Sequence, residues 1–327
     1  MREVSAIDAK ILKDLLKDGR KNFTAIAKEC GETKSTIWKH YIQMKKAGII
    51  TGATIQLNYA SFGYDAVGIV QFKTEPRLVD HAVEYCKKMP NIHSAWRMGK
   101  SSIVIVVATL ETLDELDRVK ETIKKLPLVS ELRTNVWTGI RNIPENLSII
   151  PLKKKAYKVD TPSMEVTTSI RKTASKIVDE TDIQIVEKLA KDGRVSFRKI
   201  AKDLNISTNT VSRRYEKLKR SGMIKVSIQV DPTKIGYRAS AWFYVAFLSQ
   251  SSLSTIVETL ANIPDVNLII KTSGVYDVLV EAMIKDIDQL IAIQNEIARI
   301  ESVAKMETHV ISPKPVLPLP REYISTF

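Results

Sequence analysis

The chain is poor in the residues that build disulfide frameworks, metal sites or membrane spans. Its 327 residues include two cysteines, Cys30 and Cys86, and four histidines. Each cysteine falls on the apolar side of an expected helix with no second ligand type at metal spacing. We therefore expect two buried structural thiols and no metal site.

Long apolar runs are also missing. The segment 103–110 is among the longest, and it is far too short to cross a bilayer. The first ten residues are charged and lack the apolar core of a signal peptide. These features predict a cytoplasmic protein without a membrane partner.

Positive charge is plentiful but confined to certain segments. The net charge is +13. Residues 1–50 carry 11 Lys and Arg against 6 Asp and Glu, and residues 175–225 carry 13 against 7. Residues 51–150 are nearly balanced at 12 against 11, and residues 226–327 are acidic at 8 against 11. Two separate basic blocks of about fifty residues indicate two surfaces that bind a polyanion.

The same pattern of residues occurs twice, at an offset of 174 positions. Residues 7–29 match residues 181–203, and the tetrapeptide KDGR stands at 17–20 and again at 191–194. The match continues with KAGII at 46–50 against RSGMI at 220–224. The sequence thus predicts a unit of about 140 residues used twice.

The second basic block predicts three short helices. We expect Asp182 to cap the first helix and Gly193 to adopt the left-handed conformation after it. A tight turn at Asn205 separates the second helix from a third that Ser207 caps and Gly222 ends. This spacing is typical of a helix-turn-helix module whose third helix enters the major groove.

Polar and basic side chains occupy the expected outer face of each third helix, where they suit phosphates and base edges. In the first block the candidates for DNA binding are Thr33, Lys34, Ser35, Trp38, Lys39 and Gln43. In the second they are Ser207, Thr208, Asn209, Ser212, Arg213 and Lys217. The simpler alternative, solvated helices with surface lysines, explains neither the repetition nor the near-neutral flanks. Because the two faces differ, we expect different half-sites if both bind.

Each basic block is followed by strands and helices in the order βαββαβ. In the second copy we expect strands at 239–248, 266–272, 277–284 and 303–311, and helices at 253–261 and 287–300. This order predicts a ferredoxin-like α+β domain with both helices on one face of the sheet. Segments such as 103–108 are apolar at consecutive positions, so the other face should also be buried, most simply by the sheet of the other repeat or another chain.

At this point the chain resembles the Lrp/AsnC (feast/famine) family of transcription regulators. The resemblance rests on the Asp-led first helix, the DGR stretch, the third helix at 207–222, and the segment 272–277. It implies two winged-type helix-turn-helix modules, each followed by a ferredoxin-like (RAM-type) domain for sensing and self-association. The partner would be double-stranded DNA, and the location would be cytoplasmic and nucleoid-associated.

The resemblance also implies an effector site. No cofactor is expected, but a small effector such as an amino acid would bind near Gly274, Tyr276 and Asp277. The carboxylate would suit an ammonium group, and glycine NH groups would suit a carboxylate. The alternative role for Asp277 is that of a turn or strand-cap residue. In the first copy Ser102 stands where the aspartate would fall, which puts amino-acid binding there in doubt.

The expected organisation has six parts. These are helix-turn-helix modules at 1–50 and 175–225, ferredoxin-like domains at 51–141 and 226–312, a basic linker at 142–174 and a Pro-rich tail at 313–327.

Two other functions use the same plan, a sirohaem-decarboxylase-like tetrapyrrole enzyme and a protein-interaction scaffold. The histidines have no motif spacing, and among them only His93 and Arg97 form a suggestive pair. We therefore expect no enzymatic activity.

Overall fold

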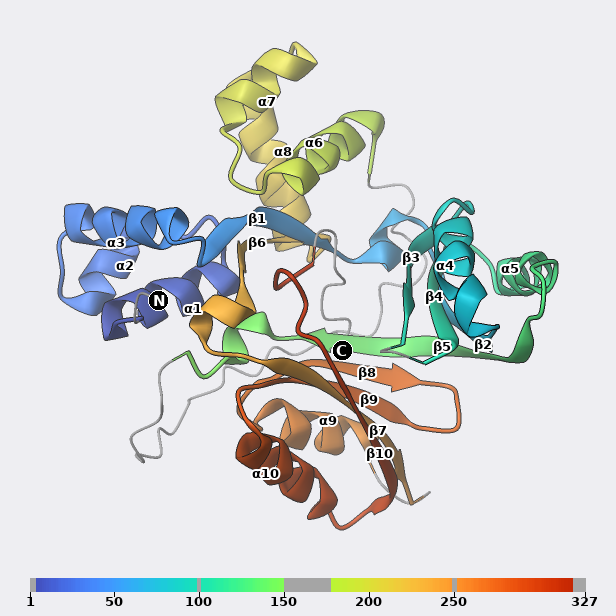
Figure 1. Cartoon of the computed structure of the whole chain (residues 1–327). Helices are drawn as coiled ribbons and strands as arrows, with labels where there is room; N and C mark the ends of the chain where they lie inside the picture. The colour runs from blue at the N-terminus through green and yellow to red at the C-terminus, as the bar shows by residue number, and fades with distance from the viewer. Residues whose placement is uncertain (1–3, 99–100, 150–177, 249–251, 320–327) are drawn as a thin grey trace.

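The computed structural model describes residues 4–98, 101–149, 178–248 and 252–319. Two three-helix units stand at the edge of a large β-structure (Figure 1). The first helical unit contains α1 (Ala6–Lys17), α2 (Phe23–Cys30) and α3 (Lys34–Lys46). The second helical unit contains α6 (Glu180–Lys191), α7 (Phe197–Leu204) and α8 (Thr208–Arg220). Of the described helices, none is long and apolar enough to cross a membrane.

Polar side chains fix the helix boundaries. Ser207 caps α8, and Asn205 turns the chain with a φ of 53°, as the sequence predicts. The prediction that Asp182 caps α6 is wrong. Asp179 is the N-cap, and Asp182 is the third helical residue, whose carboxylate completes a capping box while fully buried.

After each helical unit comes one strand of a two-stranded ribbon. β1 (Ile50–Leu57) pairs antiparallel with β6 (Ile224–Val230), with Thr54 opposite Ser227 near the middle. A winged module usually completes its own hairpin, whereas here each unit's strand pairs with the strand that follows the other unit. Residues 50 and 55 illustrate the consequence, since Ile50 lies in the core of the first helical unit and Ile55 in that of the second.

The remaining strands form one eight-stranded sheet, in the order β10-β7-β9-β8-β5-β2-β4-β3. The first half contains β2 (Ala66–Lys73), β3 (Ile92–Arg97), β4 (Ile103–Leu110) and β5 (Ser130–Asn142). The second half contains β7 (Ala239–Phe247), β8 (Val266–Thr272), β9 (Val278–Ile284) and β10 (Val303–Ile311). The first half carries the helices α4 (Val79–Lys87) and α5 (Asp114–Lys124), and the second half carries α9 (Leu253–Ala261) and α10 (Ile287–Ala298). Short 3-10 turns lie at η1 (Tyr59–Phe62), η2 (Pro76–Leu78), η3 (Pro144–Asn146) and η5 (Pro232–Ile235).

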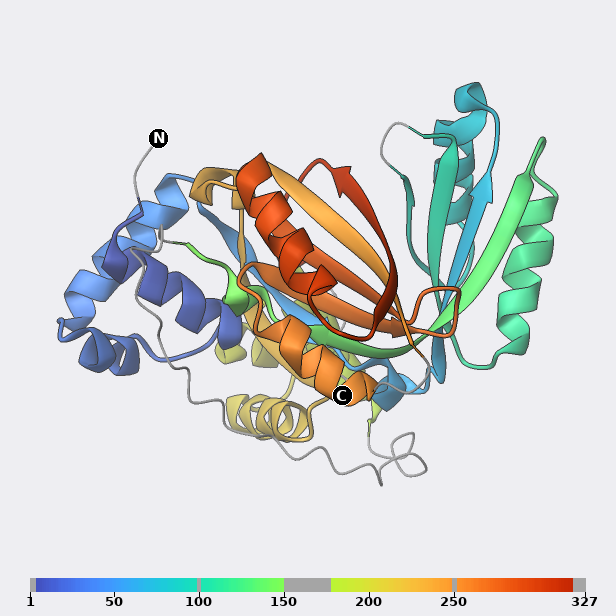
Figure 2. The ribbon, with the colours of Figure 1, turned by 90° about the horizontal axis from the view of Figure 1, so that it is seen from below.

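The two halves of the sheet have the same strand order and meet in two ways. The helices cover the outer face of each half (Figure 2), and the inner faces share one apolar cluster. That cluster contains Val67 and Ile69 from β2 together with Leu268 and Ile270 from β8. The expected burial of both sheet faces is therefore confirmed. The edge-to-edge pairing of β5 with β8 was not predicted, because it depends on β5 continuing to Asn142.

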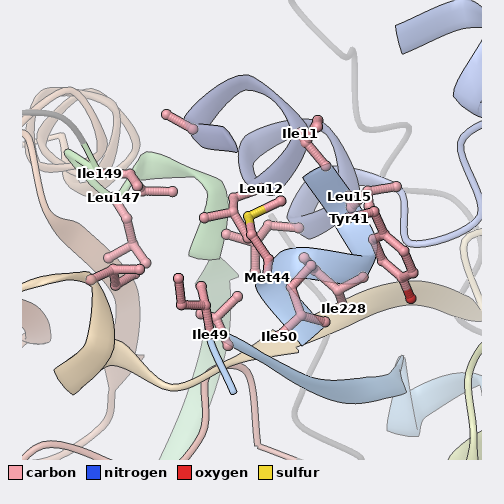
Figure 3. Close-up of a cluster of buried hydrophobic side chains, with 14 of the residues drawn as sticks. Ile11, Leu12, Leu15, Tyr41, Met44, Ile49, Ile50, Leu147, Ile149 and Ile228 are labelled. Carbon is pink, nitrogen blue, oxygen red and sulfur yellow. The ribbon is translucent and has the colours of Figure 1, made fainter. Parts of the chain in front are cut away.

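Two extended segments tie the first helical unit to the second half of the sheet. After β5 the chain places Leu147 and Ile149 in the core of the first helical unit (Figure 3). From the other end of the chain Leu317, fully buried, bridges to Val230 through two backbone hydrogen bonds of 2.9 Å. Beside it Lys314 pairs with the buried carboxylate of Glu281 at 2.7 Å. The described part of the Pro-rich tail thus packs on a neighbouring unit.

A reciprocal contact that we call the clasp joins the two helical units. It consists of the Asp-Gly-Arg loops at 18–20 and 192–194 and the groups of the other repeat that they touch. Gly19 N donates to Val226 O at 2.7 Å, and Gly193 N donates to Ala53 O at 2.9 Å. Each loop therefore lies directly on the ribbon strand that follows the other unit.

The clasp explains both glycines. Gly193 does not have a positive φ, so the prediction of a left-handed residue there is wrong. A Cβ atom at Gly193 would lie 2.7–3.0 Å from backbone atoms of Thr54, and one at Gly19 would lie 2.8–2.9 Å from backbone atoms of Ser227. Close approach of two backbones excludes a side chain at either position.

Gly193→Ala should therefore destabilise the protein by about 1–3 kcal/mol, because backbone rather than a flexible side chain must move. Urea unfolding of the full chain measures the change. Gly52→Ala is the matched control, since its Cβ would meet only the flexible end of Gln229 at 3.2 Å. The control should stay within about 0.5 kcal/mol of wild type. Equal effects at the two glycines would contradict the close approach.

Candidate nucleic-acid interface

The third helix of each unit presents a polar outer face. In α3 the apolar residues Ile37, Tyr41 and Met44 are buried, which leaves the other side of the helix open to solvent. In α8 the buried residues are Val211, Tyr215 and Leu218. The helix that precedes each one packs across it, as α2 contacts α3 and α7 contacts α8. This arrangement is that of a helix-turn-helix with an exposed recognition helix.

The structure brings the twelve predicted DNA-binding residues onto these two faces. Eleven of them are exposed, and Ser212 is half-buried. Thr33 and Ser207 use their hydroxyl oxygens as N-caps, which accept hydrogen bonds from the backbone NH groups of Thr36 and Thr210 at 3.1 and 3.0 Å. Their side chains therefore define where the helix begins, and the remaining ten residues follow along the helix.

The two faces differ in chemistry. In α3 the indole of Trp38 is 50% exposed and stacks on Tyr41, with ring centroids 5.8 Å apart. In α8 the exposed residues are Thr208, Asn209 and Arg213. An indole suits apolar contacts such as a thymine methyl group, whereas Asn and Arg suit bidentate hydrogen bonds to purines.

A buried carboxylate supports each recognition helix from behind. Asp8 in the first unit is 1% exposed and contacts His40 Nδ1 at 2.8 Å. Asp182 in the second is fully buried and accepts from Arg214 at 2.8 Å and Lys217 at 3.4 Å. Lys217, one of the predicted DNA ligands, is therefore partly engaged in an internal ion pair. Neither support was predicted from the sequence, although His40 and Arg214 both lie on the third helix, each 32 residues after its aspartate.

The predicted effector residues lie where the two halves of the sheet join. The turn 273–277 follows β8, and Ser273 N donates to Val136 O of β5 at 3.0 Å. Asp277 accepts from Phe247 N at 2.8 Å, and Gly274 N donates to the Thr272 hydroxyl at 3.2 Å. One oxygen of Asp277 is thus used by the last residue of β7, which is the strand-cap role that the sequence left open for Asp277. The glycine NH group is used within the turn.

Tyr276 is the member of this set that adjoins further aromatic and charged groups. Its ring meets Tyr244 edge-on at 5.6 Å, and Lys305 Nζ lies 5.0 Å from its centre. Burial, reinforced by a hydrogen bond to the Glu307 carboxylate, raises the pKa of Tyr276.

The cysteines and histidines lie in ordinary structural surroundings in the part of the chain that the structure describes. No group of three or more His, Cys, Asp or Glu side chains there could hold a metal ion. Burial raises the pKa of Cys86 to about 11, as expected for an inert thiol, whereas Cys30 is only half-buried. His93 contacts the hydroxyl of Tyr59 at 3.1 Å, and Arg97 donates to the carbonyl of Ser101.

Family models match three segments of the chain. Residues 178–219 match the AsnC-type helix-turn-helix domain, residues 242–316 the Lrp/AsnC ligand binding domain, and residues 5–51 a winged helix-turn-helix DNA-binding domain. The HTH-type transcriptional regulator PH1692 of Pyrococcus horikoshii is 30% identical over 134 residues, which is 90% of its length and 41% of this chain. The chain belongs to the Lrp/AsnC family.

A second relative and a solved structure also resemble this Lrp/AsnC protein. The regulatory protein AsnC of Escherichia coli is 26% identical over 143 residues, which is 94% of its length and 43% of this chain. Among solved structures, that of the siroheme decarboxylase NirDL covers 98% of this chain with a TM-score of 0.58 and 16% identity. At that identity the likeness concerns the fold, which NirDL shares over nearly the whole chain.

Proposed function

We propose that the chain is a tandem duplication of the Lrp/AsnC unit that regulates transcription by binding two unlike DNA half-sites. The observation that carries the proposal is the pair of recognition helices, α3 and α8. Each buries an apolar stripe on one side and exposes a polar and basic face on the other. The two helical units have similar folds but expose different side chains on their recognition helices, which supports recognition of two different DNA sequences.

The alternatives have less support. A tetrapyrrole decarboxylase shares the fold, but an identity of 16% to NirDL does not indicate that the two proteins share an activity. The transcriptional regulators compared above resemble the chain more closely in sequence. A protein scaffold does not explain why basic residues gather on the two recognition helices while the sheet-forming segments stay near neutral.

Arg213→Ala should weaken binding to a duplex recovered from genomic fragments retained by the protein. Loss of a base-contacting arginine costs about 1–3 kcal/mol, which is roughly a tenfold to hundredfold loss of affinity. Lys39→Ala in α3, as a phosphate ligand, should instead lower the slope of log affinity against log salt by about 0.9. Fluorescence anisotropy at several salt concentrations measures both changes.

Arg118→Ala is the matched control, because it removes an exposed arginine from α5 of the near-neutral half of the sheet. Its affinity should equal that of wild type. If Arg118→Ala weakens binding as much as Arg213→Ala, attraction to overall charge explains the binding, and the recognition-helix proposal fails.

We further propose that a small effector, such as an amino acid, binds at the turn that carries Gly274, Tyr276 and Asp277. Family relatedness and the place of this turn at the junction of the two halves support the proposal. The glycine NH group and one oxygen of Asp277 are already engaged, and the Tyr276 hydroxyl is hydrogen-bonded to Glu307, so the half-buried ring of Tyr276 is the group expected to contribute most to binding.

An effector that binds only the folded protein stabilises it, by about 2.7 kcal/mol at a concentration one hundred times its Kd. Thermal unfolding with each amino acid in turn should therefore show an upward shift for at least one. Tyr276→Ala should remove that shift, while Tyr85→Ala, which removes a 39% exposed tyrosine from α4, should keep it. An undiminished shift in Tyr276→Ala, or no shift in wild type, would count against this site.

A further inference from the structure

The arginines of the clasp reach the recognition helix of the opposite unit. The Arg194 guanidinium carbon lies 5.0 Å from the ring centre of Phe23 and 5.3 Å from that of Tyr41. Arg20 lies 4.5 Å from Phe197 and 5.3 Å from Tyr215. Because Tyr41 belongs to α3 and Tyr215 to α8, each recognition helix packs against a cation that the other repeat supplies.

The same arginines are also fixed to the opposite backbone. Arg20 Nε donates to Gly193 O at 2.9 Å, and its terminal nitrogen donates to Val195 O. In return Arg194 donates to Gly19 O. A planar guanidinium can hold two carbonyl oxygens and lie over rings at once, whereas a lysine ammonium cannot reproduce this geometry.

Hydroxyl groups on the ribbon extend this symmetry. Ser227 donates to Leu16 O at 2.9 Å, and its ribbon partner Thr54 donates to Ala190 O at 3.5 Å. The carbonyls belong to the last turns of α1 and α6. Each first helix thus ends against the shared ribbon in the same way, so the two units are related by an approximate two-fold axis through its middle.

We propose that Arg20 and Arg194 are positioning residues that hold α3 and α8 at one separation and so determine the spacing between DNA half-sites that the chain accepts. The proposal rests on the proposed function. Two linked modules gain about a hundredfold or more in affinity when both engage, and they lose the gain when the geometry forbids it. If the clasp is rigid, both modules can engage DNA together at only one spacing between the half-sites, so the gain in affinity is confined to that spacing.

The test compares full-length wild type with Arg20→Lys/Arg194→Lys on three duplexes. One duplex carries the composite site selected by wild type. The second carries an insertion of about five base pairs between the halves, which turns one half to the opposite face. The third keeps only one half-site. Lys17→Arg/Lys191→Arg is the matched control, because it changes exposed residues beside the clasp and conserves charge.

Wild type and the control should lose about a hundredfold in affinity on the insertion. The clasp variant should bind the native composite more weakly and should distinguish the two spacings by less than about tenfold. Its affinity for the single half-site should stay within about twofold of wild type, since each recognition helix remains folded.

The proposal would be overturned if the clasp variant distinguished the native composite from the insertion duplex as strongly as wild type does. It would also be overturned if wild type bound both duplexes equally well. A fall in single-site affinity as large as the fall on the composite would also overturn it, because the arginines would then hold each unit folded rather than set their separation. Failure of wild type to select any duplex would instead refute the proposed function itself, and this inference with it.

Discussion

The close approach of each Asp-Gly-Arg loop to the ribbon strand of the other repeat is the constraint on which the arrangement of the helical units depends. The approach needs glycine at positions 19 and 193, because backbone atoms of the partner strand occupy the space of a Cβ. Once the glycines allow it, the neighbouring arginines can reach across to the opposite aromatic rings. Contacts between the repeats therefore fix the position of each helical unit on the shared ribbon, whereas contacts within a unit hold its recognition helix.

The two halves are nevertheless not equivalent. The first helical unit takes Leu147 and Leu317 into its core, from the two extended segments that also bind the second half of the sheet. One of these segments is fixed by the buried pair of Glu281 with Lys314, and breaking such a pair is costly because it leaves a charge without its partner. The sheet itself joins through β5 and β8, two strands at different places in their repeats. A chain that contains both repeats can acquire such one-sided contacts, which two identical subunits would have to form in pairs.

Local patterns in the sequence predicted most of the elements. β8, β10 and α9 have the expected bounds, since alternation, apolar runs and turn residues define them without reference to distant contacts. The recognition helix of the second unit followed in the same way from its cap, Ser207, and from Gly222, which ends it. The sequence could not show which distant residue each of these local features contacts. Gly193 was interpreted as a helix terminator, because nothing local indicates that Thr54 would lie against it.

The candidate site shows the same division between local and distant information. Exposure of Trp38 and Arg213 follows from helical periodicity, but the ion pair of Lys217 with Asp182 requires two helices to be packed together. The continuation of β5 to Asn142 depends on pairing with β8, and the sequence around it has prolines that favour a linker. The repetition of KDGR indicated that this tetrapeptide has a special role. The role became clear only from the structure, because each copy contacts residues of the other repeat.

The central claim is that α3 and α8 bind two unlike half-sites in one fixed arrangement. Selection of bound duplexes from a random library by the full-length protein, followed by sequencing, tests this most directly. The account predicts one composite motif whose halves differ in sequence and are separated by a constant number of base pairs. A motif with two identical halves, halves at variable separation, or no enrichment at all would contradict it.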